Sequence, residues 1–198
     1  MAQVKKTAVR RAILDAAFEL FVARGYSDTT MSQIAAHAGV SASNIYVYFA
    51  SKLEIVYAIF DPWLRDRLRR LEAESEPIAD PRHRLRHILL TVWREIPRDN
   101  NAFMSNVMQA VATATPEQGY NRELLFWAEA RVAHMIAGCM AHPTSAARDS
   151  GHLSHVIFMA LDGFAMNERL GQTATPIEDI VDAFVDRFTT SVVEQVSA

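Results

Sequence analysis

The chain of 198 residues is predicted to fold as an all-α protein of roughly nine helices. Apolar residues recur three and four positions apart throughout, and no segment alternates apolar and polar residues with the period of a strand. Capping residues, Gly and Pro stand at the ends of these periodic segments. Half of the residues (50%) are apolar and 22% are charged, which is the composition of an ordinary globular protein.

Three helices are expected in the first quarter of the chain. In residues 8–24, apolar side chains share one helical face. They are Ile13, Ala16, Ala17, Leu20 and Phe21. Thr30 and Gln33 form a capping box that opens a short helix, which Gly39 closes. Ser41 then caps a second short helix after a tight turn.

A longer helix is expected to start at the capping box of residues 51–54. Pro62 lies inside this helix and lacks an N–H group, so we expect a kink there or a restart at Asp61. Residues 65–76 are dense in charge. Because opposite charges are interspersed, we interpret them as a solvated helix end rather than a nucleic-acid patch.

Five further helices complete the predicted fold. Asp80 and Pro81 start the first of them, and Pro97 is expected to stop it. The others are expected at residues 103–111, 115–142, 152–170 and from residue 175 onward.

Charge is divided unevenly along the chain, whose net charge is −3. Residues 1–52 hold six Lys or Arg and three acidic residues, so they carry +3, and the remaining residues therefore carry −6. A basic head on an acidic body is the pattern expected when only one end of a protein meets phosphate. A solvated charged face explains this modest excess equally well, so the charge marks only a head, residues 1–52, and a body, residues 53–198.

The cellular compartment is predicted from cysteine usage and hydropathy. Cys139 is the only cysteine, so no intramolecular disulfide forms and a reducing compartment is expected. No apolar signal segment follows the N-terminus, and no apolar stretch is long enough to span a membrane. We expect a cytoplasmic protein that makes no contact with a membrane.

Residues 39–52, "GVSASNIYVYFASK", combine small polar residues with aromatics. Two short helices joined by a tight turn that contains Gly, with a supporting helix before them, are typical of a helix-turn-helix. Its second helix enters the major groove, where Asn pairs with adenine, Ser exchanges hydrogen bonds and an Ala methyl contacts thymine. Tyr hydroxyls and Lys ammonium groups suit phosphate contacts. The candidate DNA-binding residues are Thr30, Ser41, Ala42, Ser43, Asn44, Tyr46, Tyr48 and Lys52, while Ile45 and Phe49 are expected in the core.

The stretch "TTMSQIAAHAGVSASNIYVYFASK", residues 29–52, resembles the DNA-binding signature of TetR-type transcriptional regulators, and the helix order and chain length agree. The chain departs from that signature at Ala42–Asn44, where Lys-Gly-Thr is frequent, at Val47 in place of His, and at Ala50 in place of Pro. The resemblance implies a homodimer that reads a palindromic double-stranded DNA operator and is released from it by a small-molecule effector. The expected function is that of a repressor.

A dimer interface is expected on the last two helices. Residues 152–170 are apolar on more faces than one chain obviously covers, and Ala160 and Gly163 allow close approach of another helix. The candidate dimerisation residues are Val156, Ala160, Gly163, Phe164, Val181, Phe184 and Phe188.

The resemblance also implies an effector site in the body. Large apolar side chains there suggest a hydrophobic or aromatic effector. The candidate lining residues are Trp63, Trp93, Phe103, Met104, Met108, Phe126, Trp127 and Met159, with Asp162 as a polar group that orients the ligand. Such side chains at helical spacing are also what an ordinary core contains.

Other classes of function receive less support. No phosphate loop and no nucleophile elbow is present, so no catalytic residue and no cofactor is expected. His83 and His87, like His152 and His155, have a spacing compatible with metal binding, which leaves a metal-sensing regulator as an alternative, although no metal ligand is assigned. A helical interaction module that retains the helix-turn-helix without specific DNA binding is a second alternative.

Overall fold

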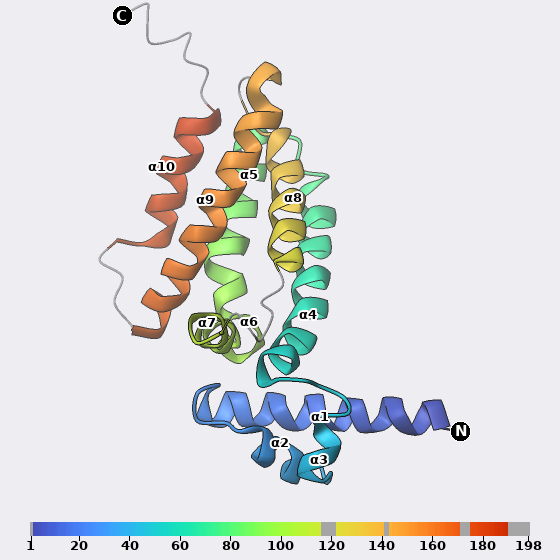
Figure 1. Ribbon diagram of the computed structural model, residues 1–198. Coiled ribbons are helices and arrows are strands. Elements are labelled where there is room, and N and C mark those ends of the chain that lie inside the picture. The colour runs from blue at the N-terminus through green and yellow to red at the C-terminus, as the bar shows by residue number, and fades with distance from the viewer. Residues whose placement is uncertain (1, 116–121, 141–142, 171–174, 190–198) are drawn as a thin grey trace, which may run out of the picture. The chain divides into compact units, whose positions relative to one another are not determined.

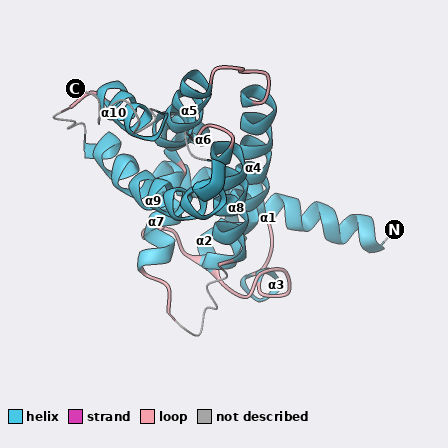
Figure 2. Cartoon of the chain, turned by 90° about the horizontal axis from the view of Figure 1, so that it is seen from above, coloured by secondary structure: helices cyan, strands magenta, loops and turns pink. Residues whose placement is uncertain are grey.

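The computed structural model describes residues 2–115, 122–140, 143–170 and 175–189. Within those ranges the chain forms helices and connecting loops, and no residue lies in a strand (Figures 1 and 2). The helical elements are α1 (Ala2–Arg24), α2 (Met31–His37), α3 (Ala42–Ile45), α4 (Lys52–Ser75), α5 (Pro81–Leu90), the π-helix η1 (Thr91–Glu95), α6 (Ile96–Ala102), α7 (Met104–Ala112), α8 (Glu123–Ala137), α9 (Pro143–Leu170) and α10 (Ile177–Thr189).

The all-α class predicted from the sequence is confirmed. α5, η1 and α6 follow one another without a break, so the described part of the chain holds nine separate helical segments. None of the helices in this part is both long and apolar enough to cross a membrane.

Pro97 does not stop the helix that begins at Pro81, so that prediction is wrong. The wide π-turn η1 precedes Pro97, and the N–H of Ile96 donates to the carbonyl of Thr91, five residues earlier. Pro97 is therefore the second residue of α6, a position where a missing N–H costs little. The helical path continues to Ala102.

Pro62 lies inside α4, which is helical from Lys52 to Ser75 without interruption (Figure 1). The predicted restart at Asp61 is therefore wrong, and the kink remains a prediction. Two hydrogen bonds cap the N-terminus of α4. The N–H of Glu54 donates to Ser51 Oγ (3.2 Å), and Glu54 Oε2 accepts from the N–H of Ala50 (2.7 Å).

Two helices start earlier than predicted. α1 begins at Ala2 rather than residue 8, and α9 begins at Pro143 rather than residue 152. The helix expected over residues 115–142 corresponds to α8, and part of its predicted range, residues 116–121, lies outside the described residues.

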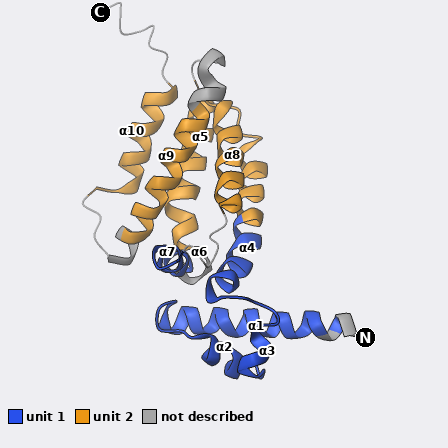
Figure 3. Cartoon of the chain, viewed as in Figure 1, with its two compact units in different colours: residues 1–64, 100–121 blue, residues 65–99, 122–198 orange. Residues whose placement is uncertain are grey.

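The chain divides into two compact units (Figure 3). The first comprises residues 1–64 and 100–121, and the second comprises residues 65–99 and 122–198. The predicted boundary after residue 52 falls at the start of α4, whereas compact packing of the first unit continues through the first half of that helix and includes α7.

The core of the first unit forms around α1. The apolar face predicted for this helix is buried: Ile13, Ala16, Ala17, Leu20 and Phe21. Phe103, which is 0% exposed, stacks on Phe18 with ring centroids 5.4 Å apart and tilts against Phe21 at 6.1 Å. Gln109 Oε1 accepts a hydrogen bond from the Ser27 hydroxyl (3.2 Å). Aromatic packing and this bond explain why a segment so distant in sequence belongs to the first unit.

Trp93 lies at the centre of the second unit. Its indole N–H donates to the carbonyl of Ile157 (2.9 Å), and its ring packs against Phe164 and Phe184 at centroid distances of 5.1 and 5.3 Å. α5 and η1 are also tied to α10 by ion pairs along one side. These join Arg82 to Asp186, Arg86 to Asp182 and Arg94 to Glu178.

Candidate nucleic-acid interface

α2 is fixed at its start by the capping box that the sequence predicted. The N–H of Gln33 donates to Thr30 Oγ1 (3.3 Å), and the N–H of Thr30 donates to Gln33 Oε1 (2.8 Å). The side chain of Thr30 therefore acts as the N-cap of α2. The end of α2 is held against α1, because His37 Nε2 lies 2.7 Å from the carboxylate of Glu19 on α1.

The turn between α2 and α3 depends on Gly39. This residue has φ +68°, a conformation that costs an L-residue with a side chain more than it costs glycine. The reversal lets Val40 donate its N–H to the carbonyl of Ala35 (2.9 Å), which closes the end of α2. α3 begins two residues later, as predicted.

α3 is capped by Ser41, whose hydroxyl oxygen accepts from the N–H of Asn44 (3.1 Å) and lies 3.1 Å from the hydroxyl of Ser43. Ile45 (0% exposed) and Phe49 (1%) anchor this segment in the core, which confirms their prediction as core residues. The opposite side of the segment faces outward. Its exposed residues are Ser41, Ala42, Ser43, Asn44, Tyr46 and Val47, whereas Tyr48 is half-buried.

These exposed polar and methyl-bearing side chains form a small surface above the buried Ile45 and Phe49. The residues predicted to contact base edges, Ala42–Asn44, are exposed together in the first turn of α3. Tyr46 follows two residues after Asn44 and is 57% exposed. Ala42, Ser43 and Asn44 are therefore accessible to solvent, as residues that contact base edges must be.

Lys52, like Thr30, uses its side chain for hydrogen bonds within the chain. Its ammonium donates to the carbonyl oxygens of Tyr26 (2.5 Å) and Thr29 (2.6 Å) and lies 4.0 Å from the centroid of the Tyr26 ring. Burial lowers the pKa of Lys52, and the nearby carboxylate of Asp28 opposes that shift. Two of the three ammonium protons therefore form hydrogen bonds to backbone carbonyls of the same chain. These bonds hold the loop that precedes α2.

Arg10 is a basic residue of this surface that the sequence did not single out. It is exposed on α1, and its guanidinium carbon lies 5.0 Å from the centroid of the Phe49 ring. The contact joins α1 to the segment after α3, so a positive charge is held beside the candidate interface. Periodicity gave no signal for it, because Arg10 is on the solvent face of its helix.

The first unit carries the decisive resemblance to known proteins. Residues 13–59 match the family model described as "Bacterial regulatory proteins, tetR family". Residues 13–59 form a TetR-family DNA-binding domain. The matched residues are those of a helix-turn-helix found in DNA-binding transcriptional regulators.

The matches to TetR-family relatives extend over different lengths of the chain. The transcriptional regulator SrpR of Pseudomonas putida is 44% identical over 68 residues, which are 34% of this chain and 30% of SrpR. RutR of Escherichia coli K12 is 28% identical over 163 residues, 80% of this chain and 74% of RutR. The matched part of the chain spans between about a third and a half of SrpR, TtgW and TtgR of P. putida.

Solved structures share the fold over nearly the whole chain. FadR of Bacillus halodurans has a TM-score of 0.63 at 16% identity, covering 92% of this chain and 95% of FadR. The protein described as superantigen PfiT has a TM-score of 0.66 at 19% identity, covering 92% and 97%. Identities this low establish the fold alone.

The residues predicted to line an effector site occupy different environments. Phe103 and Trp93 belong to the cores of their respective units, while Met104 and Met108 are half-buried on α7. Trp63 lines a groove of about 540 Å³ in the first unit, together with Leu14, Phe18 and Ile59. Trp127 is half-buried, and three candidates of the second unit are exposed: Phe126 (59%), Met159 (65%) and Asp162.

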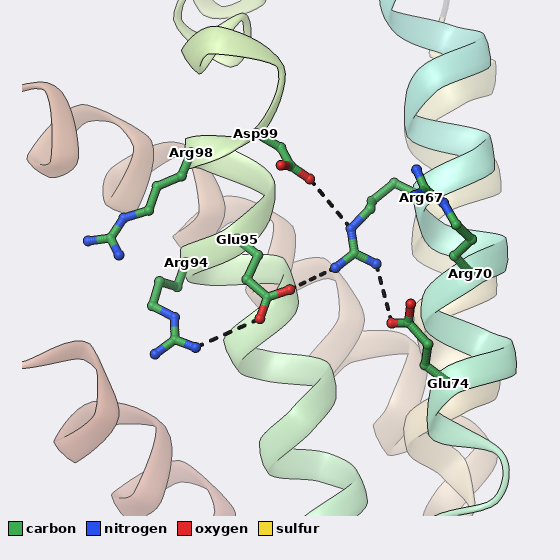
Figure 4. A pocket seen from close by; sticks show the side chains of 7 residues that line it. All are labelled: Arg67, Arg70, Glu74, Arg94, Glu95, Arg98 and Asp99. Atoms are coloured by element: carbon green, nitrogen blue, oxygen red, sulfur yellow. Dashed lines mark hydrogen bonds and ion pairs between the residues drawn. The ribbon is translucent and has the colours of Figure 1, made fainter.

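A cavity of about 470 Å³ in the second unit is charged rather than apolar (Figure 4). Arg67 lies at its centre, with guanidinium nitrogens 2.7 Å from Glu95, 3.5 Å from Glu74 and 3.6 Å from Asp99. The rest of its lining is Arg70, Arg94 and Arg98. None of the predicted effector residues lines this cavity, whose ion pairs join α4 to the α5–α6 path.

The predicted dimerisation residues separate into outer and inner groups. On α9, exposed residues recur at helical spacing along one stripe: Val156, Met159, Gly163 and Met166. Phe184 and Phe188 of α10 line an apolar groove of about 510 Å³. Ala160 and Phe164 are half-buried. Val181 is 0% exposed and lies on the buried side of α10 within the single chain.

Metal binding and thiol chemistry find no support in the described residues. Across these ranges, no group of three or more His, Cys, Asp or Glu residues is arranged to hold a metal ion. Burial raises the pKa of the Cys139 thiol to about 11, so the side chain stays protonated at neutral pH.

Proposed function

We propose that this protein is a ligand-responsive repressor of the TetR family that binds a palindromic DNA operator as a homodimer. The observation that carries the proposal is the first turn of α3, where Ala42, Ser43 and Asn44 are exposed while Ile45 and Phe49 hold the helix in the core. Asn44 suits adenine, Ser43 suits several bases, and the methyl group of Ala42 suits thymine. Tyr46 and Arg10 supply phosphate contacts at the margin.

The homodimer is proposed to form through α9 and α10. Its support is the exposed stripe of Val156, Met159, Gly163 and Met166 together with the apolar groove along α10. A second copy that presents the same stripe buries both, and Gly163 permits close contact because it lacks a side chain. Two symmetry-related α3 helices then meet two half-sites of one operator.

The effector is proposed to be a small hydrophobic or aromatic molecule whose binding lowers DNA affinity. Named relatives support this class: one solved structure is described as FadR of Bacillus subtilis in complex with stearoyl-CoA, and another as a multidrug binding protein, EbrR, complexed with imidazole. In the first unit, Trp63 and the methionines of α7, Met104 and Met108, are half-buried candidates that such a molecule could contact. An effector acts only through its different affinities for the DNA-bound and free conformations.

The deciding experiment is fluorescence anisotropy of the full chain on labelled duplexes tiled across the DNA that flanks its own gene. Each duplex is titrated at two salt concentrations beside a scrambled duplex of equal composition. We expect tight binding to one palindromic duplex, with affinity that falls steeply with salt because phosphate contacts release counterions. Equal binding to all duplexes, unchanged by a panel of hydrophobic ligands, would favour the interaction module over the repressor.

The metal-sensing alternative is tested on the same operator. Zinc or nickel at a small molar excess is added to the complex. Release from DNA by either metal would support metal sensing, and unchanged affinity with both would remove it.

A further inference from the structure

The exposed face of α9 is arranged symmetrically about Met159. Exposed residues lie three, four and seven positions before it (Val156, His155 and His152) and three, four and seven positions after it (Asp162, Gly163 and Met166). The residues between them are buried or half-buried. Members of this face therefore recur every seven residues, the spacing that forms a continuous seam between two packed helices. We call this face the α9 seam.

Such symmetry suits contact between the α9 seam and a second copy of itself. A two-fold axis that crosses the seam at Met159 makes the two helices antiparallel, so residues before Met159 face residues after Met159 of the second copy. Met159, which is 65% exposed, then meets its own copy at the centre and supplies apolar contact there.

Helix geometry places His155 and Asp162 on one edge of the α9 seam. They are rotated about 40° and 60° to the same side of Met159, and they lie about 6 Å before it and about 4.5 Å after it along the helix axis. In the antiparallel pair, His155 and Asp162 of the second copy therefore lie on the same side and within about 2 Å of each other along the axis. In a parallel pair, each residue would face its own copy, and the carboxylates of Asp162 would repel each other.

The other edge of the α9 seam allows the two helices to approach closely. Val156 and Gly163 are rotated about 60° and 40° to this side of Met159, so Val156 of one copy faces Gly163 of the other. No neighbouring atom of the described chain lies within 4 Å of the place where a Cβ on Gly163 would stand. The side chain of Val156 from a second copy can therefore fill that space.

His155 is oriented by its own chain. Its Nδ1 lies 2.7 Å from Oε1 of Glu129 on α8, whose side chain is only 17% exposed. An ionised carboxylate only accepts hydrogen bonds, so Nδ1 carries the proton, and Nε2 is directed away from Glu129. The other element packed against α9, η1, carries Arg94 and Glu95, which pair with Glu178 and Arg67 rather than with His155.

Asp162 gains from a cation placed beside it. The residue is exposed, yet surrounding protein atoms desolvate its carboxyl and raise the pKa of Asp162. A nearby positive charge compensates for the lost hydration of the carboxylate.

We propose that two copies of the chain pair through antiparallel α9 helices centred on Met159, with His155 of each copy bound to Asp162 of the other. This pairing rests on the proposed homodimer and specifies its register. Nδ1 already donates to Glu129, and only an imidazolium donates from both nitrogens, so the bond to Asp162 requires protonated His155. Dimerisation is therefore expected to take up protons near neutral pH.

The test is a double-mutant cycle on the dimer dissociation constant, measured at pH 6.5 by sedimentation velocity of the full chain. His155→Gln and Asp162→Asn remove the two charges. The residues are two turns apart in one chain, about 10 Å, so their effects should be independent unless they meet across an interface. The matched control is His152→Gln, since His152 is also exposed on α9 but faces Met166 of the second copy. Circular dichroism verifies the fold of each variant.

Each single change, His155→Gln or Asp162→Asn, should raise the dissociation constant at least about fivefold, because two bonds are lost per dimer. The double variant should be no weaker than the weaker single variant. His152→Gln combined with Asp162→Asn should instead give the product of the two separate effects. Single variants without effect, or a double variant of His155 and Asp162 that equals the product of its singles, would overturn the pairing.

The pH dependence gives a second readout. The dissociation constant of the unaltered chain should fall between pH 8 and pH 6, because protonation of His155 supplies the second donor. Asp162→Asn should lose this dependence, and a dependence that persists in Asp162→Asn would contradict the pairing.

Met159→Glu separates failure of the register from failure of the interface. If this change dissociates the dimer while the effects of His155→Gln and Asp162→Asn multiply, α9 forms the interface but the register is wrong. If the dimer tolerates Met159→Glu, or if the chain is monomeric at every concentration, the proposed interface is wrong and the pairing is wrong with it.

Discussion

The ammonium of Lys52 donates a hydrogen bond to the backbone carbonyl of Thr29, at 2.6 Å. Lys52 is the first residue of α4, and Thr29 precedes the cap of α2, so one side chain ties the start of the long helix to the start of the helix-turn-helix. A second bond to Tyr26 and the contact with its ring strengthen this tie. The residue therefore positions the DNA-binding helices.

Lys52→Met should lower operator affinity without changing its dependence on salt. A phosphate contact would reduce the slope of log affinity against log salt by about 0.9, whereas a positioning residue leaves the slope as it was. Loss of two charge-assisted hydrogen bonds should also destabilise the first unit by about 1–3 kcal/mol. Anisotropy titrations at several salt concentrations measure both affinity and slope. A slope reduced by one contact would show that Lys52 binds phosphate after all.

Asn44→Ala should weaken binding to the operator by about 1–3 kcal/mol, because it removes a bidentate contact to one base. Binding to scrambled DNA should stay the same, since Asn44 is expected to contact no phosphate. Tyr46→Phe is the matched comparison: it removes only a hydroxyl and should weaken operator and scrambled duplexes alike. If neither variant changes operator affinity, the roles assigned to α3 are wrong even though the fold is right.

Gly39→Ala should destabilise the first unit by about 1–2 kcal/mol. No atom lies within 4 Å of the position of an added Cβ, so the cost comes from the backbone, which has φ +68° there. Gly151→Ala is the control, because Gly151 lies inside α9 with equally open surroundings and no positive φ. That change should stabilise the helix by about 0.5–1 kcal/mol. Urea unfolding of both variants gives the comparison, and equal signs would contradict the assignment of the turn.

Phe103→Ala should destabilise the first unit by about 3–5 kcal/mol, because a fully buried ring leaves a cavity against Phe18 and Phe21. Phe126→Ala is the control, since that ring is 59% exposed, and its effect should stay within about 0.5 kcal/mol. Thermal unfolding monitored by circular dichroism measures both. Similar losses for the two variants would show that Phe103, the residue before α7, does not complete the core of the first unit.

Met159→Glu should raise the dimer dissociation constant at least about tenfold, because it places a charge in the centre of the proposed interface. Met159 is 65% exposed in the single chain, so the monomer should keep its fold. Phe126→Glu changes an exposed apolar residue on α8 and is the control. Sedimentation velocity over a range of protein concentrations measures the constant. A dimer that tolerates Met159→Glu would place the interface elsewhere.

The sequence by itself determined the caps and the turn of the helix-turn-helix. Thr30 with Gln33, Ser41 with Asn44, and the left-handed Gly39 act within a few residues of one another, so their bonds follow from spacing alone. The inward orientation of Ile45 and Phe49 follows from the same short-range periodicity. For this reason the helix-turn-helix and its exposed residues were predictable without coordinates.

Only the tertiary structure decided which side chains meet across long distances in sequence. Lys52 contacts Thr29 rather than solvent, Phe103 completes the core around α1, and three arginines converge on Trp127. Val181 shares an apolar stripe of α10 with the residues of the groove. It is nevertheless buried, because other parts of the same chain pack against that side of the helix. Helical periodicity shows that a face is apolar, but what covers that face depends on the packing of segments that are distant in the chain.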